Sequence, residues 1–103
     1  MSGRLETLRG LLEQDPANSR FRYMLAMELV SMGDLETAIA EFTALLEKDP
    51  TYGAGYYHGG QTFEKLGRVA DAREIYRRGI VATGQSGDAH TQSELQGALD
   101  LIS

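Results

Sequence analysis

The feature of this sequence that most constrains its fold is an internal repeat with a period of 34 residues. The Asp-Pro pair at 15–16 recurs at 49–50, and the Leu-Leu-Glu run at 11–13 recurs at 45–47. Further matches at the same shift pair Leu5 with Ile39, Tyr23 with Tyr57, Gly33 with Gly67, and Ala38 with Ala72. Such a period predicts stacked structural units in which each unit contacts its neighbours along the chain.

Within each period the apolar residues have helical spacing. Leu25 and Leu29 lie at i and i+4 and therefore share one face of a predicted helix. Gly33 relieves the strain of the left-handed conformation that ends a helix, and the Asp34 carboxylate is expected to accept from the free amides of the next one. Pro50 ends that second helix, because proline lacks the donor and disfavours helical geometry just before it. Each period is thus predicted to form two helices joined by a tight turn, and no segment alternates like a strand.

These signals predict an all-α fold, an α-solenoid of stacked antiparallel helix hairpins. The predicted helices are 2–14, 18–32, 35–48, 52–66, 69–83 and 88–102. One domain is expected over 1–103, divided into a half-unit helix (2–16), two full units (17–50 and 51–84), and a loop with a capping helix (85–103). The last unit is expected to end at Gly84, before a polar loop and an N-cap at Asp88. The polar outer face of the last helix is typical of a terminal cap.

The pattern resembles the tetratricopeptide repeat, whose signature runs W-x2-L-G-x2-Y, then A-x3-F, then P over about 34 residues. The matching positions are Arg22, Leu25, Ala26, Leu29, Ala38, Phe42 and Pro50 in the first unit, and Tyr56, Gly59, Gly60, Phe63, Ala72, Tyr76 and Gly84 in the second. The resemblance covers nearly the whole chain and implies a small protein of the bacterial type. Two positions depart from the signature: Arg22 replaces an aromatic residue, and Gly59 replaces a leucine. Gly59 forms either a notch for a partner's side chain or a gap that Tyr56, Tyr57 or Phe63 fills.

Composition excludes several classes of function. The formal charge is −5, from 10 basic and 15 acidic residues, and nucleic-acid binding needs clustered cations. There is no cysteine, which removes disulfides and thiolate metal sites and fits a cytoplasmic location. No apolar run is long enough to span a membrane, and the first residues lack the apolar core of a signal peptide. We therefore expect a cytoplasmic protein with no nucleic-acid or membrane partner.

The sequence carries no recognisable catalytic constellation. The two histidines, His58 and His90, have no carboxylate or histidine neighbours at ligand spacing. No phosphate-binding loop, metalloprotease, nucleophile-elbow or calcium-loop motif is present. We expect no enzymatic activity, no cofactor and no metal. Acidic residues are expected to pair along solvated helix faces, as Glu74 does with Arg78 at i, i+4.

In a stack of such hairpins, the first helix of each unit lines the concave side, which solenoids use for binding. The residues expected to face this groove are Arg20, Tyr23, Met27, Val30, Tyr57, Gln61 and Glu64. Tyr23 and Tyr57 lie one period apart, so their rings are expected on neighbouring helices, either as binding anchors or as packing between helices. Relatives that bind chaperone C-terminal tails use lysines, asparagines and an arginine as a carboxylate clamp. That clamp is missing, because the matching positions hold Tyr23, Met27 and His58.

Two functions follow as hypotheses. The first is a non-enzymatic adaptor or scaffold that binds a peptide or protein segment of apolar or basic character in the groove. The alternative is a self-association module that forms a homodimer through the groove or the terminal helices. Light scattering over a concentration series separates them, because a constant monomer mass favours the adaptor.

Overall fold

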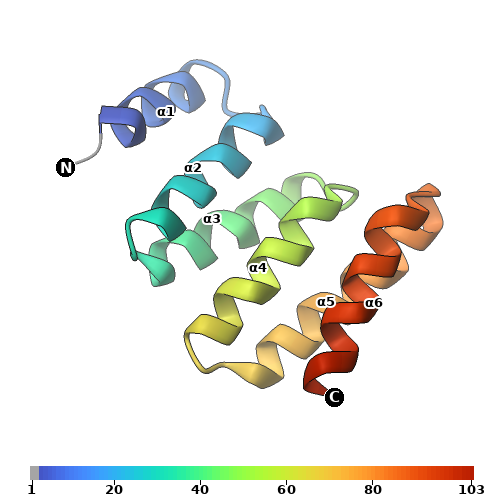
Figure 1. Cartoon of the computed structure of the whole chain (residues 1–103). Helices are drawn as coiled ribbons and strands as arrows, with labels where there is room; N and C mark the ends of the chain where they lie inside the picture. Colours follow the sequence, from blue (N-terminus) through green and yellow to red (C-terminus); the bar gives the residue numbers. More distant parts are fainter. Residues whose placement is uncertain (1–2) are drawn as a thin grey trace.

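The computed structural model describes residues 3–103, which form six α-helices in a row of antiparallel hairpins (Figure 1). The helices are α1 (Gly3–Gln14), α2 (Ser19–Ser31), α3 (Leu35–Lys48), α4 (Gly53–Lys65), α5 (Val69–Ser86) and α6 (Ala89–Ile102). Each predicted helix is therefore present, and the all-α solenoid class is confirmed. The predicted start at Ser2 lies outside the described residues.

The helices are arranged in two layers. Helix α4 contacts both α2 and α6, so the first helices of successive units are neighbours. Within residues 3–103, α3 and α5 make no backbone contact with each other, although both pack on α4. Figure 1 shows α4 and α6 in front of the fainter α3 and α5. The close layer of α2, α4 and α6 is the inner side of the curve, and the separated layer of α1, α3 and α5 is the outer side.

The buried side chains form two clusters joined at α3. The first cluster combines α1, α2 and α3 around Leu29 and Phe42, which are 1% exposed. The second runs from Leu46 to α6 around Tyr76 and Leu95, which are fully buried. Leu45 belongs to the first cluster and Leu46 to the second. Adjacent residues of α3 therefore pack into the cores of both units.

The tight turns inside the two full units have the same geometry. Gly33 and Gly67 adopt φ of 81° and 75°, the left-handed conformation in which glycine carries no side-chain penalty. The Asp34 N–H then donates to the Leu29 carbonyl at 2.9 Å, which closes the end of α2. The predicted cap by the Asp34 carboxylate is absent. Asp34 is exposed, so water can satisfy the free amides at the start of α3.

The predicted helix end at residue 83, with a loop over 85–87, was wrong. Helix α5 continues to Ser86 and ends at Gly87, whose φ of 79° provides the left-handed cap. Gly84 instead makes room for α6, because an alanine Cβ there would lie 2.6 Å from Gln92 Nε2. That Gln92 nitrogen donates to the Ile80 carbonyl at 3.3 Å. The predicted N-cap at Asp88 is confirmed by its bond with the Thr91 N–H.

Helix α4 is expected to open more readily than α3. It contains Gly53, Gly55, Gly59 and Gly60, whereas α3 contains no glycine, and each interior glycine lowers helix propensity by about 1 kcal/mol relative to alanine. Native-state hydrogen exchange should therefore show amides of 53–66 opening about fivefold faster, or more, than those of 35–48. Equal protection of the two helices would show that packing cancels the propensity difference.

Candidate functional site

An aromatic cluster lies on the inner layer where α2 meets α4. The Tyr23 ring lies 5.3 Å from that of Tyr52 and 5.8 Å from that of His58, measured between ring centroids. Tyr57 also contacts His58, in a T-shaped arrangement with the ring centroids 5.2 Å apart. The four rings thus form a chain in which His58 joins the two predicted tyrosines. All four residues are half-buried.

Tyr52 extends this cluster beyond what the sequence predicted. It immediately precedes α4, at the position that Asn18 occupies before α2. The Asn18 side chain caps its helix by accepting from the Phe21 N–H at 2.9 Å, whereas Tyr52 makes no side-chain cap. An aromatic residue in place of a capping residue was the available signal, because tyrosine has no local role at a helix start. Its ring instead packs against both core clusters and contacts the Tyr23 ring.

The surroundings of Tyr23, Tyr52 and His58 favour the neutral forms of these side chains. Burial raises the pKa of Tyr23, and the neighbouring Tyr52 adds to this shift. Burial also raises the pKa of Tyr52, although the Arg20 guanidinium opposes it. Burial lowers the pKa of His58, against the opposing charge of Glu94 on α6. Burial thus favours the neutral imidazole of His58, and the carboxylate of Glu94 on α6 opposes this effect.

The predicted groove residues on α2 continue this surface toward α1. Met27 and Val30 are half-buried and pack against the first core cluster. Met27 also lines a pocket of about 230 Å³ together with Tyr23, Met24 and Leu8. An ion pair of 3.6 Å between Arg4 and Glu28 adjoins it, and both residues line the pocket. Exposed Arg20 lies at the opposite end of α2.

Two of the predicted groove residues on α4 have an internal role. Gln61 donates to the Tyr76 hydroxyl at 2.9 Å, and that hydroxyl donates to Glu64 at 2.5 Å. Burial and the bond to Glu64 together raise the pKa of Tyr76 well above its ordinary value. One unit earlier, the equivalent positions hold Met27, Val30 and Phe42. Gln61 and Glu64 thus both bond the Tyr76 hydroxyl, which the first unit lacks because Phe42 stands at that position. Neither side chain lies free in the groove.

The structure leaves no notch at Gly59. An alanine Cβ at this position would lie 2.8 Å from Ile75 Cδ1 and 3.6 Å from Phe42 Cβ. The space of the missing leucine is thus taken by Ile75 of α5, and the prediction that Tyr56, Tyr57 or Phe63 fills it was wrong. The first unit has the opposite arrangement, with Leu25 on the first helix and Glu41 at the position of Ile75.

Across residues 3–103, no group of three or more His, Asp or Glu side chains is placed to hold a metal ion. None of the described helices has the length and apolar character needed to cross a bilayer. What the inner surface offers is aromatic area, hydroxyls and scattered charges.

Comparisons with known proteins agree with this geometry. A family model described as tetratricopeptide repeat matches residues 23–89. A TPR repeat-containing protein of Pseudomonas aeruginosa is 28% identical over 91 residues, covering 88% of this chain and 87% of the relative. The solution structure of a tetratricopeptide repeat domain protein from Salinibacter ruber is 37% identical, with a TM-score of 0.82 over 86% of this chain and 90% of that one. The TPR2B domain of yeast Sti1, solved in complex with pHsp70, shares the fold at 16% identity, with a TM-score of 0.88 over 95% of this chain and 78% of that one.

Proposed function

The chain belongs to the tetratricopeptide repeat family, and from this premise we propose that it is a non-enzymatic adaptor that binds a peptide or protein segment along α2, α4 and α6. The observation that carries the proposal is the aromatic cluster of Tyr23, Tyr52, Tyr57 and His58 on this inner layer. Half-buried tyrosines fixed by their neighbours offer large apolar area with little rotamer entropy left to lose on binding.

The chemistry of the surface favours an apolar or basic segment. Burial favours the neutral forms of Tyr23, Tyr52 and His58, and Glu94 is the charged group that acts most strongly on His58. A cation over a tyrosine face gains about 0.5–2 kcal/mol, so a lysine or arginine beside an apolar residue suits both features. An acidic tail would find no lysine or asparagine clamp here. The yeast complex supports the proposal only as an example of this fold holding a partner.

Tyr23→Ala and Tyr57→Ala are each expected to weaken partner binding by about 2 kcal/mol, roughly 30-fold in Kd. The partner is first identified by capture from the source cell and mass spectrometry, and its Kd is then measured by calorimetry with the purified protein. Arg77→Ala, on the exposed face of α5, is the control and should change Kd by less than about twofold.

Circular dichroism and thermal unfolding of each variant separate binding from stability. Tyrosine variants that stay folded and bind normally would exclude the inner layer as the binding surface. Variants that unfold would instead show that these tyrosines serve the core. A molecular mass that doubles with concentration in light scattering, and that Tyr23→Ala returns to the monomer value, would replace the adaptor with the self-association module.

A further inference from the structure

His58 occupies the middle of the aromatic cluster. Its ring centroid lies 5.8 Å from that of Tyr23 on α2 and 5.2 Å from that of Tyr57, its neighbour on α4. Within residues 3–103 the imidazole makes no hydrogen bond or ion pair, and no fully buried side-chain nitrogen of these residues lacks a partner. Both ring nitrogens therefore keep some contact with water, so His58 can take up a proton without leaving the cluster.

Charged and titratable groups reach His58 from three helices. Burial lowers the pKa of His58, the Glu94 carboxylate on α6 raises it, and the Lys65 ammonium on α4 lowers it. Helix α2 contributes the Tyr23 hydroxyl, whose own pKa is raised by burial. On α6, exposed His90 lies 3.7 Å from the Glu94 carboxylate. Histidine is the side chain whose charge ordinarily changes between pH 5 and 8, so acidification adds a positive charge to the middle of the cluster.

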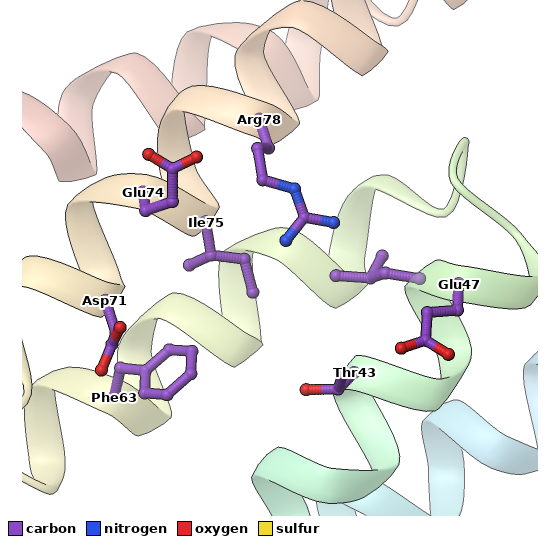
Figure 2. A pocket seen from close by; sticks show the side chains of 8 residues that line it. Thr43, Glu47, Phe63, Asp71, Glu74, Ile75 and Arg78 are labelled. Carbon is purple, nitrogen blue, oxygen red and sulfur yellow. The ribbon is translucent and has the colours of Figure 1, made fainter.

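The outer side of the stack offers no comparable group. There, arginines of the chain itself lie beside the carboxylates: Arg22 donates to Glu41 at 2.8 Å. In a pocket of about 190 Å³ between α3 and α5, Figure 2 shows Arg78 between Glu74 and Glu47. No histidine lines this pocket. A charge that changes near neutral pH beside a proposed binding surface is therefore a feature of the inner layer.

The two units differ at the position of His58. The repeat places Met24 there in the first unit, and its side chain, 41% exposed, cannot titrate. Because the first unit folds with methionine at this position, the helix packing does not require an imidazole. The added charge is thus specific to the second unit.

We propose that protonation of His58 releases a basic segment from the inner layer, so that the protein binds this segment at neutral pH and loses it on acidification. The inference rests on the proposed adaptor function. A lysine or arginine over the face of Tyr23 or Tyr57 lies beside His58, because both rings contact the imidazole. Positive charges at such separations repel, and half-burial limits their screening by solvent. The imidazolium also competes with the cation of the segment for the Glu94 carboxylate.

The probe is the peptide acetyl-Leu-Lys-Leu-amide, titrated into the full chain at pH 7.5 and pH 5.0 and followed by amide chemical shifts of α2 and α4. Its Kd is expected to be about tenfold weaker at pH 5.0. The same peptide with norleucine in place of lysine carries no charge, and its Kd should change by less than about twofold. Circular dichroism at both pH values shows whether the helices persist.

Two variants remove the proton acceptor. His58→Phe keeps a ring between Tyr23 and Tyr57 but cannot be protonated, so the lysine peptide should bind it at both pH values with Kd equal to within about twofold. His58→Met introduces the residue of the first unit and carries the same expectation. His90→Gln is the matched control. It removes the histidine whose side chain is 86% exposed, and the pH dependence should stay at about tenfold.

The control variant also allows a direct measurement of the proton. His90→Gln leaves His58 as the only histidine of the chain, so the ring-proton chemical shifts report its protonation alone. By linkage, saturation with the lysine peptide should lower the pKa of His58 by the same factor through which protonation weakens the Kd of the peptide. Saturation with the norleucine peptide should leave this pKa unchanged.

The possible results separate this inference from the proposed function. A lysine peptide that binds wild type equally at both pH values, or that keeps its pH dependence in His58→Phe and His58→Met, would overturn the role of His58. Equal pH dependence of the norleucine peptide, or loss of the helices at pH 5.0, would overturn charge repulsion as the cause. A lysine peptide that fails to bind at pH 7.5 would refute the adaptor proposal for basic segments, and this inference with it.

Discussion

Gly60→Ala is expected to lower the free energy of unfolding by about 3 kcal/mol and the Tm by roughly 15 °C. The alanine Cβ would lie 2.1 Å from Cε1 and 2.5 Å from Cζ of Tyr76, whose ring is fully buried. An aromatic ring cannot bend away as a flexible side chain can, so α4 and α5 must separate. The gain of about 1 kcal/mol in helix propensity is smaller than this cost. Thermal and urea unfolding measure the difference.

Gly97→Ala is the matched control for this substitution. Gly97 also lies inside a helix, but an alanine Cβ there would meet nothing within 4 Å. This variant should be stabilised by up to about 1 kcal/mol. A Gly60→Ala protein as stable as wild type would show that α4 and α5 are not fixed at their present separation.

Tyr76→Phe is expected to destabilise the protein by about 2 kcal/mol, because it removes the hydroxyl that bonds both Gln61 and Glu64. A triple variant tests the cause. Tyr76→Phe combined with Gln61→Met and Glu64→Val reproduces the set Phe42, Met27 and Val30 of the first unit. This triple variant should recover most of the lost stability, measured by urea unfolding. A triple variant less stable than the single one would show that the polar pair has another structural role.

The same hydroxyl predicts a dependence of stability on alkaline pH. The pKa of Tyr76 is raised in the folded protein by burial and by Glu64, so above pH 10 the unfolded chain releases this proton first. The contribution of Tyr76 to stability is therefore present below pH 10 and is lost as the pH rises further. The Tm of Tyr76→Phe should fall less steeply above pH 10 than that of wild type. Identical slopes would contradict the assignment, since Tyr23, Tyr52 and Tyr56, whose pKa values are also raised, remain in both proteins.

The 34-residue period was sufficient to predict the helices and their stacking, because both depend on patterns that recur along one chain. The period was insufficient to predict the end of α5, where two glycines both suit a helix C-terminus. Gly84 and Gly87 both fit the end of a helix, and only the approach of Gln92 from α6 distinguishes them. The period also placed Tyr23 and Tyr57 on neighbouring helices, but it could not show that His58 and Tyr52 complete the cluster.

The groove positions on α4 show a second contact that the period alone does not reveal. Gln61 and Glu64 have the helical phase of inner-surface residues, and their phase alone predicted a binding role. Their partner, the Tyr76 hydroxyl, comes from a helix across a turn. Comparison of the two units would have revealed it, since polar residues appear at these two positions only in the unit whose core aromatic residue carries a hydroxyl.

The paired differences between the units also bear on how the chain avoids mispaired hairpins while it folds. Repeat proteins risk misassembly because similar helices can dock on the wrong partner. If α2 docked on α5, Arg22 would meet Ile75 in place of Glu41, and the Tyr76 hydroxyl would face Met27 and Val30. Each such unpaired buried polar group costs about 1–3 kcal/mol. The units differ in Arg22 against Tyr56 and in Phe42 against Tyr76. These differences make the wrong pairing of helices less stable than the pairing of each first helix with its own second helix.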